Sequence, residues 1–296
     1  GMNQFIICQG YSKTGMISVL IGAALNIVLD PIFIFVLGMN VKGAAIATVI
    51  SQLASCIFVL KFLFGKKSML RIKIRRPSLK NAKRVIKLGL TPFLIIAFDN
   101  VMLISLNSMI TKYGAGGIGD MLLSCNTILQ SFMLMITMPL GGITGGTQTI
   151  LGYNYGARRP DKIIEAQKNI ALLSFIFCAV MFIIAQTVPE YFIMIFTRDP
   201  EYIEMTKDIT GLYTKGVLLL ALQYTIVDGF TGMGVFKYAF ILSAWRKLIY
   251  FACVFLIPPV FGVYSIFYCE PLSDILGPAA SLIIYFTFGR KLLKRL

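Results

Sequence analysis

Residues 14–37 read TGMISVLIGAALNIVLDPIFIFVL and contain one ionisable side chain, Asp30. A helix needs about 20 mainly apolar residues to cross the hydrocarbon core of a bilayer, which is about 30 Å thick. This stretch is long enough, and similar stretches follow it between clusters of charge. The sequence therefore predicts an all-α multipass membrane protein with about eight spans, at 14–37, 43–64, 88–111, 121–150, 170–189, 209–235, 239–265 and 271–289.

The composition excludes a soluble domain. Of the 296 residues, 57% are hydrophobic and only 14% are charged, whereas an ordinary soluble domain is about 25% charged. The chain has no histidine, which excludes His-based zinc sites and Ser-His-Asp triads. Its six cysteines form no CxxC motif. We therefore expect no enzyme activity, no cofactor and no metal other than a possible coupling ion.

The net charge of +15 is explained by topology. With an even number of spans, both ends of the chain lie on one face, and 23 of the 28 basic residues are assigned to that face, Arg246 and Lys247 among them. Most acids, including Glu270 and Asp274, are assigned to the opposite face. The positive-inside rule then places both termini in the cytoplasm and the protein in the cell membrane. No nucleic-acid partner is expected.

Weak internal similarity suggests a repeat. Gly10 lies in an F-x4-G-x2-K pattern and Gly234 in a similar F-x3-G-x2-K pattern, and Pro31 corresponds to Pro259, at offsets of 224 and 228 residues. Transporters are often built from two related helical bundles. A period of about 228 residues predicts one complete bundle preceded by the end of another, with about four helices missing from the N-terminal side. The predicted parts are an N-terminal lobe remnant (1–65), a basic cytoplasmic linker (66–87) and a six-helix C-terminal lobe (88–296).

Asp30 is the strongest candidate for a functional residue. An ionisable side chain inside a span is costly unless it faces a cavity or a partner. Asn26 lies one helical turn earlier on the same face, and Pro31 removes a helix hydrogen bond nearby. Thr48 on the next helix is expected to add a hydroxyl. This cluster suits a proton or a sodium ion, and the alternative is an interhelical hydrogen bond that only fixes packing.

Two further acids lie in predicted spans. Asp99 and Asp228 are candidates to bind a cationic substrate or a coupling ion, and the alternative for each is a structural role in helix packing. Four glycines inside the predicted span 121–150 form GxxxG pairs without the Lys-Ser/Thr ending of a phosphate loop, so they predict helix bending or close packing. These glycines are Gly141, Gly142, Gly145 and Gly146.

Three segments carry a family resemblance. They are GAALNIVLDPIFIFVLGMNVKGAAIATVISQ at 22–52, TQTILGYNYGARRPDKIIEA at 147–166 and MIFTRDPEYIEM at 194–205. The chain resembles the multidrug and toxic compound extrusion (MATE) transporters over nearly its whole length. The resemblance implies twelve helices in two six-helix lobes, of which this chain would supply helices five to twelve. It also implies export of drugs or other organic cations in exchange for protons or sodium.

The resemblance extends to site residues. Asn26, Asp30 and Thr48 match the cation-binding residues of helices five and six, while the helix-one Asp of the family has no counterpart here. Asp99 matches an acid that some relatives use in helix seven. The helix-ten acid of relatives aligns nearer Leu222 than Asp228, which weakens that assignment.

The predicted function is a cation-coupled antiporter that exports small-molecule drugs or organic cations across the lipid bilayer by alternating access. One alternative is a flippase for a lipid-linked precursor, which would require several cationic residues in the cavity. A second alternative is a truncated fragment that does not transport.

Overall fold

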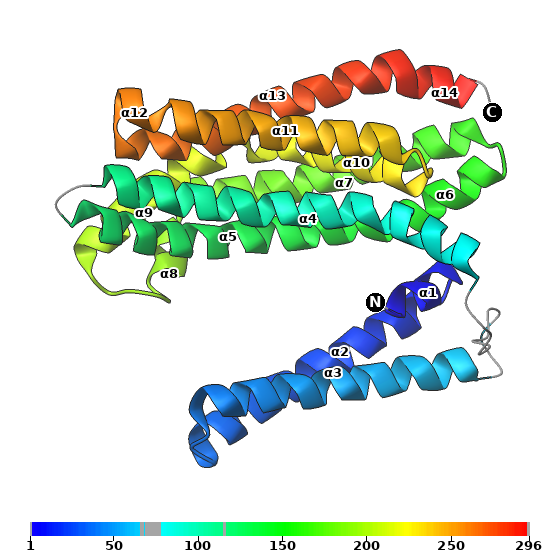
Figure 1. Ribbon diagram of the computed structural model, residues 1–296, viewed down its shortest axis with the longest axis horizontal. Helices are drawn as coiled ribbons and strands as arrows, with labels where there is room; N and C mark the ends of the chain where they lie inside the picture. Colours follow the sequence, from blue (N-terminus) through cyan, green and yellow to red (C-terminus); the bar gives the residue numbers. More distant parts are fainter. Residues whose placement is uncertain (1, 66–67, 69–77, 115–116, 295–296) are drawn as a thin grey trace. The chain divides into compact units, whose positions relative to one another are not determined.

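The computed structural model describes residues 2–65, 68, 78–114 and 117–294. The described chain is helical, and no strand occurs among these residues. Figure 1 shows long helices, as the sequence predicts. In order they are α1 (Asn3–Cys8), α2 (Ser12–Pro31), η1 (Ile32–Val36), α3 (Asn40–Phe64), α4 (Leu79–Tyr113), α5 (Ile118–Gly146), α6 (Gln148–Gly156), α7 (Pro160–Thr187), α8 (Pro189–Ile193), α9 (Pro200–Tyr213), η2 (Thr214–Gly216), α10 (Val217–Gly232), α11 (Phe236–Leu256), α12 (Pro258–Phe261), η3 (Val263–Tyr268), α13 (Cys269–Ile284), η4 (Tyr285–Gly289) and α14 (Arg290–Lys294).

The multipass membrane fold is confirmed. In the described chain, six continuous helical stretches are long and apolar enough to cross a membrane. The predicted windows 88–111 and 209–235 are also helical, in α4 and in α9 to α10. The second of these is divided by the 3-10 turn η2, which composition alone does not reveal. Large apolar side chains such as Phe35 and Val41 are exposed, at 80% and 84%, as expected where a helix faces lipid.

The chain divides into two compact units, residues 1–79 and 80–296. The division falls inside the predicted linker 66–87. Residues 66–67 and 69–77 of that linker lie outside the described residues. Residues 79–87 are not a connector but the start of α4, because the sequence from Leu79 to Lys87 contains no proline or glycine to stop a helix.

Unit 1 is a helical hairpin of α2 and α3 with the short helix α1 beside it (Figure 1). Small residues let α2 and α3 approach closely. A Cβ atom added at Gly22 would lie 2.4 Å from the Ser55 hydroxyl oxygen, and that hydroxyl donates a hydrogen bond of 2.7 Å to the Ser18 carbonyl. The buried apolar core of this unit is small and consists of Ile6, Val59 and Leu63.

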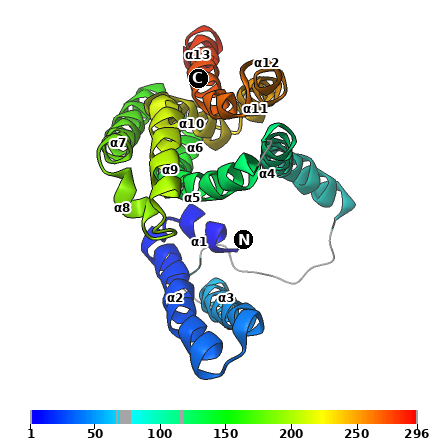
Figure 2. The ribbon, with the colours of Figure 1, turned by 90° about the vertical axis from the view of Figure 1, so that its left-hand side faces the viewer.

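Unit 2 is a helical bundle with α10 at its centre, packed against α5, α6, α7, α11 and α13 (Figure 2). Its larger apolar core includes Leu129, Phe132 and Leu220, and a second cluster includes Ile163 and Phe230. The central helix α10 packs against α5, α6 and α11, each of which contributes a polar side chain to the site. Residues on α10 therefore have fixed positions relative to those on α5, α6 and α11.

The GxxxG glycines of α5 do not make close contacts among the residues that the structure describes. A Cβ atom at Gly142 or Gly146 would meet nothing within 4 Å, and one at Gly141 or Gly145 would meet its nearest side chain at 4.0 Å. Close packing within the described chain is therefore not observed at these four positions. Gly145 and Gly146 instead end α5, and after a turn at Thr147 the chain continues as α6.

Candidate functional site

The predicted cluster in unit 1 is built on the C-terminal turn of α2. The Asn26 amide Nδ2 donates a hydrogen bond of 3.1 Å to Asp30 Oδ1, one turn later on the same helix face. Pro31 ends α2 and cannot donate a backbone hydrogen bond, and a π-helical turn, Ile32–Val36, follows it. π-Helical turns are rare and are often found at functional sites. The local backbone is therefore irregular where the carboxylate lies.

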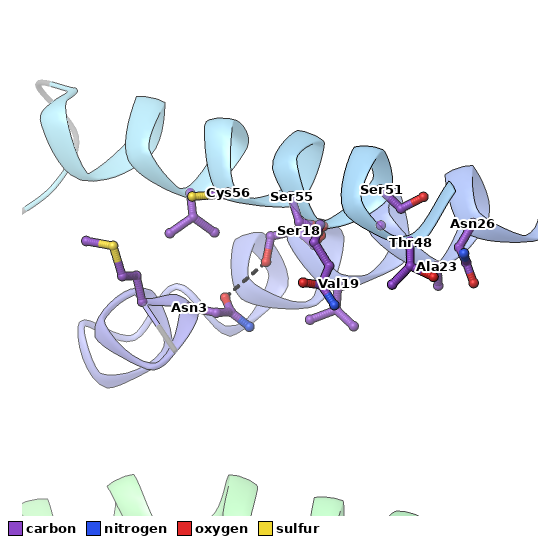
Figure 3. A pocket seen from close by; sticks show the side chains of 13 residues that line it. Asn3, Ser18, Val19, Ala23, Asn26, Thr48, Ser51, Ser55 and Cys56 are labelled. Atoms are coloured by element: carbon purple, nitrogen blue, oxygen red, sulfur yellow. Dashed lines mark hydrogen bonds between the residues drawn. The ribbon is translucent and has the colours of Figure 1, made fainter. Parts of the chain in front are cut away.

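Thr48 does not complete this cluster in the way that the sequence suggests. Its hydroxyl donates a 2.9 Å hydrogen bond to the Ala44 carbonyl of its own helix, a common arrangement for threonine in a helix. Asn26 and Thr48 nevertheless line one cavity of about 720 Å³ between α2 and α3, together with Ser51 and Ser55 (Figure 3). Asp30 is not among the residues that line this cavity.

The oxygen atoms around this cavity suit a small cation. Asn26, Thr48 and Ser51 offer amide and hydroxyl oxygens, and the buried Ser51 hydroxyl has no hydrogen-bond partner among the described residues. In the described part of the chain, no three His, Cys, Asp or Glu side chains lie close enough together to hold a metal ion. A sodium ion in this cavity would therefore be held by neutral oxygens, since Asp30 does not line it.

A second cavity, in unit 2, brings together both predicted acids of the C-terminal part. Asp99 comes from α4 and Asp228 from α10, and they line one cavity of about 420 Å³. Apolar and aromatic side chains form part of its wall, and two basic side chains join the acids. The remaining lining residues are Ile96, Gln148, Gln223, Tyr224, Val227, Thr231, Ser243, Arg246 and Lys247.

Asp228 is held by uncharged donors from two other helices. The Thr144 hydroxyl of α5 donates to its Oδ2 at 2.5 Å, and the Gln148 amide Nε2 of α6 donates to its Oδ1 at 3.1 Å. Both carboxylate oxygens thus have a partner, and no ion pair to Asp228 is observed in the described chain. The structure places Asp228 at the cavity rather than at a water-exposed helix end.

Asp99 forms an ion pair that the sequence does not predict. The Lys247 ammonium of α11 lies 2.5 Å from Asp99 Oδ1. The Lys247 side chain is 8% exposed and that of Asp99 is 57% exposed. The carboxylate therefore reaches the open side of the cavity, while the ammonium that neutralises it is enclosed by the bundle.

Arg246, the neighbour of Lys247, points to a buried acidic pair on α13. Its Nη2 lies 2.5 Å from Glu270 Oε1 and 2.7 Å from Asp274 Oδ1, and its Nε donates to the same Asp274 oxygen at 2.9 Å. Arg246 lines the cavity, so this cluster adjoins it.

These contacts correct the predicted charge distribution. Arg246 and Lys247 do not belong to cytoplasmic loops but lie within the span of α11. Glu270 and Asp274 are not exposed acids of the opposite face but are buried on α13. Two signals were present in the sequence: the two acids are spaced i, i+4, and Asp274 falls inside the predicted span 271–289. The predicted set of intramembrane acids was therefore incomplete.

Comparison with known proteins agrees with this architecture. The sequence profile of the MatE family matches residues 96–256. The "Multidrug export protein MepA" of Staphylococcus aureus (strain MSSA476) is 25% identical over 287 residues, which cover 96% of this chain and 62% of that protein. The chain thus spans less than two thirds of the length of this relative.

Solved structures show the same fold. A structure described as "Crystal structure of MATE in the straight conformation" superposes with a TM-score of 0.87 at 21% identity, covering 100% of this chain and 66% of that one. A second, described as "Outward-facing conformation of a multidrug resistance MATE family transporter of the MOP superfamily", gives a TM-score of 0.86 at 21% identity over 97% of this chain and 63% of that one.

Proposed function

Because this chain belongs to the MatE family of multidrug and toxic compound extrusion transporters, we propose that it exports drugs or organic cations across the cell membrane in exchange for protons or sodium ions. The family consists of transporters and not of enzymes. The chain covers 62% of the length of the S. aureus relative. The transport activity of this chain is therefore a proposal.

The cavity of unit 2 is the observation that carries this proposal. It joins apolar and aromatic walls, such as Ile96 and Tyr224, to the carboxylates of Asp99 and Asp228. Small-molecule sites are mostly apolar with a few placed polar groups. An organic cation combines an apolar body with a positive charge, and both features have a counterpart in this cavity.

The proposed coupling site is the Asn26–Asp30 pair with Thr48 nearby. A carboxylate in a span is costly to ionise without a partner, so binding of a proton or a sodium ion at Asp30 would change the energy of the surrounding helix turn. Alternating access then follows if the ion binds the two arrangements of the transporter with different affinity. Substrate leaves outward as the coupling ion enters.

Asp30→Asn tests the coupling proposal. The amide keeps the size of the side chain but removes its charge, so we expect loss of gradient-driven uptake of a cationic fluorescent dye into everted vesicles, in which the direction of export is inward. Separate vesicle preparations with a proton gradient and with a sodium gradient identify the ion. Asp208→Asn, at an exposed position of α9, is the matched control. Unchanged dye export in Asp30→Asn contradicts the assignment.

The basic residues of the cavity favour a second candidate, a substrate that carries an anionic group, such as a lipid-linked precursor. Arg246 and Lys247 both line the cavity, although each is paired with an acid. Under this alternative Lys247→Met would abolish substrate binding, whereas an organic-cation substrate would bind Lys247→Met at least as well. The same variant thus separates the two functions.

A further inference from the structure

The Arg246–Glu270–Asp274 cluster combines one positive with two negative side chains. All three groups are enclosed, with side-chain exposures of 16% for Arg246, 11% for Glu270 and 0% for Asp274. If both acids were ionised, the cluster would carry a net charge of −1 inside the bundle. A buried carboxylate without a compensating cation is strongly disfavoured, and two acids beside one cation resist full ionisation.

The groups that face the acids from neighbouring helices do not supply the missing positive charge. Tyr213 of α9 forms a hydrogen bond with Glu270 and accepts one of 3.2 Å from Gln130. The other ionisable groups near the two acids are the neutral side chains of Tyr224 on α10, Tyr250 on α11, Cys178 on α7 and Cys269 on α13.

Charged groups at the cavity complete this inventory. Lys247 of α11 and Asp99 of α4 both interact electrostatically with Glu270, and they form an ion pair with each other. The charge of this pair is balanced within itself, so it does not offset the extra negative charge of the cluster. Of the positive groups that the structure describes near the two acids, only Arg246 contacts them.

One carboxylate oxygen without a hydrogen-bond partner indicates where the missing positive charge is bound. Asp274 Oδ2 is buried and has no hydrogen-bond partner among the described residues. It faces the backbone of η2, where a Cβ atom added to Gly216 would lie 2.4 Å from Asp274 Cβ and 3.2 Å from Oδ2. The packing here is too close for a hydrated ion. A proton needs no such space.

We propose that Glu270 and Asp274 share one bound proton, and that this proton determines how strongly the two acids hold Arg246 at the wall of the cavity. The reaction is simple protonation: a proton from water adds to a carboxylate oxygen and gives a neutral carboxylic acid. With the proton bound, Arg246 faces one remaining carboxylate. Without the proton, Arg246 faces two carboxylates. Its positive charge is then more fully neutralised, and less of that charge acts on the cavity that Arg246 lines.

This site is distinct from the proposed coupling site at Asp30, which belongs to unit 1. It deepens the proposed function, because a proton here would change the charge offered to a substrate in the cavity. Proton binding itself does not depend on transport. It can therefore be measured on the purified chain with no substrate and no gradient.

Infrared spectroscopy tests the proposal directly, because the C=O stretch of a protonated carboxylic acid is separate from the bands of a carboxylate. We expect such a band in the purified chain at about pH 7, where an isolated Asp or Glu is ionised. The variants are compared in an Asp228→Asn background, which removes the part-buried acid held only by uncharged donors. In this background Glu270→Gln and Asp274→Asn should each remove the band, because one acid beside Arg246 needs no proton. Arg246→Gln should raise it about twofold, because two acids then lack a cation.

Glu165→Gln is the matched control, since Glu165 is an exposed acid of α7 whose side chain is 60% accessible, and it should leave the band unchanged. Each variant must elute from a size-exclusion column at the same volume as the parent chain and give the same helical circular dichroism. Because Arg246→Gln moves the band in the opposite direction to the acid variants, general loss of structure cannot imitate the full pattern.

Two results would overturn the proposal. The first is a band that persists unchanged when Glu270→Gln and Asp274→Asn are each made in the Asp228→Asn background, or its absence from the Asp228→Asn chain. The second is loss of the band when sodium chloride replaces choline chloride, which would assign the site to sodium. Failure of dye export with this band intact would count against the proposed function and leave the proton site standing.

Discussion

At the residue scale, a charged side chain inside an apolar window is the sequence feature that indicates a functional residue. Asp99 and Asp228 stood out in this way, and both line one cavity. Their partners could not be predicted, because Lys247 is 148 residues from Asp99 in sequence and pairing depends on how each helix is rotated. For Thr48 the sequence predicts a hydroxyl near Asp30. In the structure that hydroxyl instead donates a hydrogen bond to the Ala44 carbonyl of its own helix.

The Lys247–Asp99 pair leads to a prediction about substrate binding. Lys247→Met keeps the apolar stem and removes the ammonium, which leaves the half-exposed Asp99 carboxylate without its partner. A cationic dye can then take the place of the ammonium, and the exposed position limits the gain to about 1 kcal/mol, or about fivefold in Kd. Fluorescence anisotropy of the dye with purified protein measures this change.

Lys237→Met is the control for this experiment, because Lys237 is an exposed lysine near the start of the same helix. It should leave the Kd of the dye unchanged. Weaker dye binding in Lys247→Met, or an equal gain in both variants, would show that the pair does not compete with a cationic substrate.

At the scale of helices, apolar windows predicted the spans well but not their interruptions or contact faces. The window 209–235 contains the turn η2, whose Gly216 lies against Asp274. The spacing of the GxxxG glycines in α5 predicts close packing, yet close glycine contacts of unit 2 lie at other positions. A Cβ atom at Gly152 of α6 would lie 2.7 Å from the Gly232 carbonyl of α10. A spacing rule does not specify which helix face meets a neighbour.

This contrast gives a stability prediction. Gly232→Ala places a methyl group 2.9 Å from the Gln148 Cα and carbonyl oxygen, so it should destabilise the bundle by about 1–3 kcal/mol. Gly142→Ala, in the interior of α5 with nothing described within 4 Å, should be neutral or stabilise by up to about 1 kcal/mol, because alanine favours a helix.

Thermal unfolding of the two variants in detergent measures the difference. We expect the Tm of Gly232→Ala to fall by several degrees and that of Gly142→Ala to stay equal or rise, since about 1 kcal/mol corresponds to about 2–4 °C in a domain of this size. A Tm of Gly232→Ala at or above that of Gly142→Ala would refute the assigned contact between α6 and α10.

At the scale of the whole molecule, the sequence predicted a small N-terminal part and a large C-terminal part from the repeat offset and the charge clusters. In the structure the chain divides into units 1–79 and 80–296. Their boundary could not be fixed, because the basic residues after Leu79 were assigned to a connector whereas they belong to α4. Charge density marks a segment that leaves the membrane, but it does not stop a helix.

The separate cores of the two units predict different behaviour in isolation. Unit 2 contains two buried apolar clusters and every residue that lines its cavity, from Ile96 to Lys247, while among the described residues the apolar cluster of unit 1 has three buried members. A chain of residues 80–296 should therefore fold in detergent with a Tm within about 4 °C of the full chain. It should also bind a cationic dye, with the same gain in affinity on Lys247→Met.

Residues 1–79 alone should unfold without a cooperative transition, because so few buried apolar contacts cannot offset the entropy of ordering the hairpin. Loss of dye binding in a well-folded 80–296 chain would place part of the binding site in unit 1 and remove the cavity of unit 2 as the sole basis for substrate recognition.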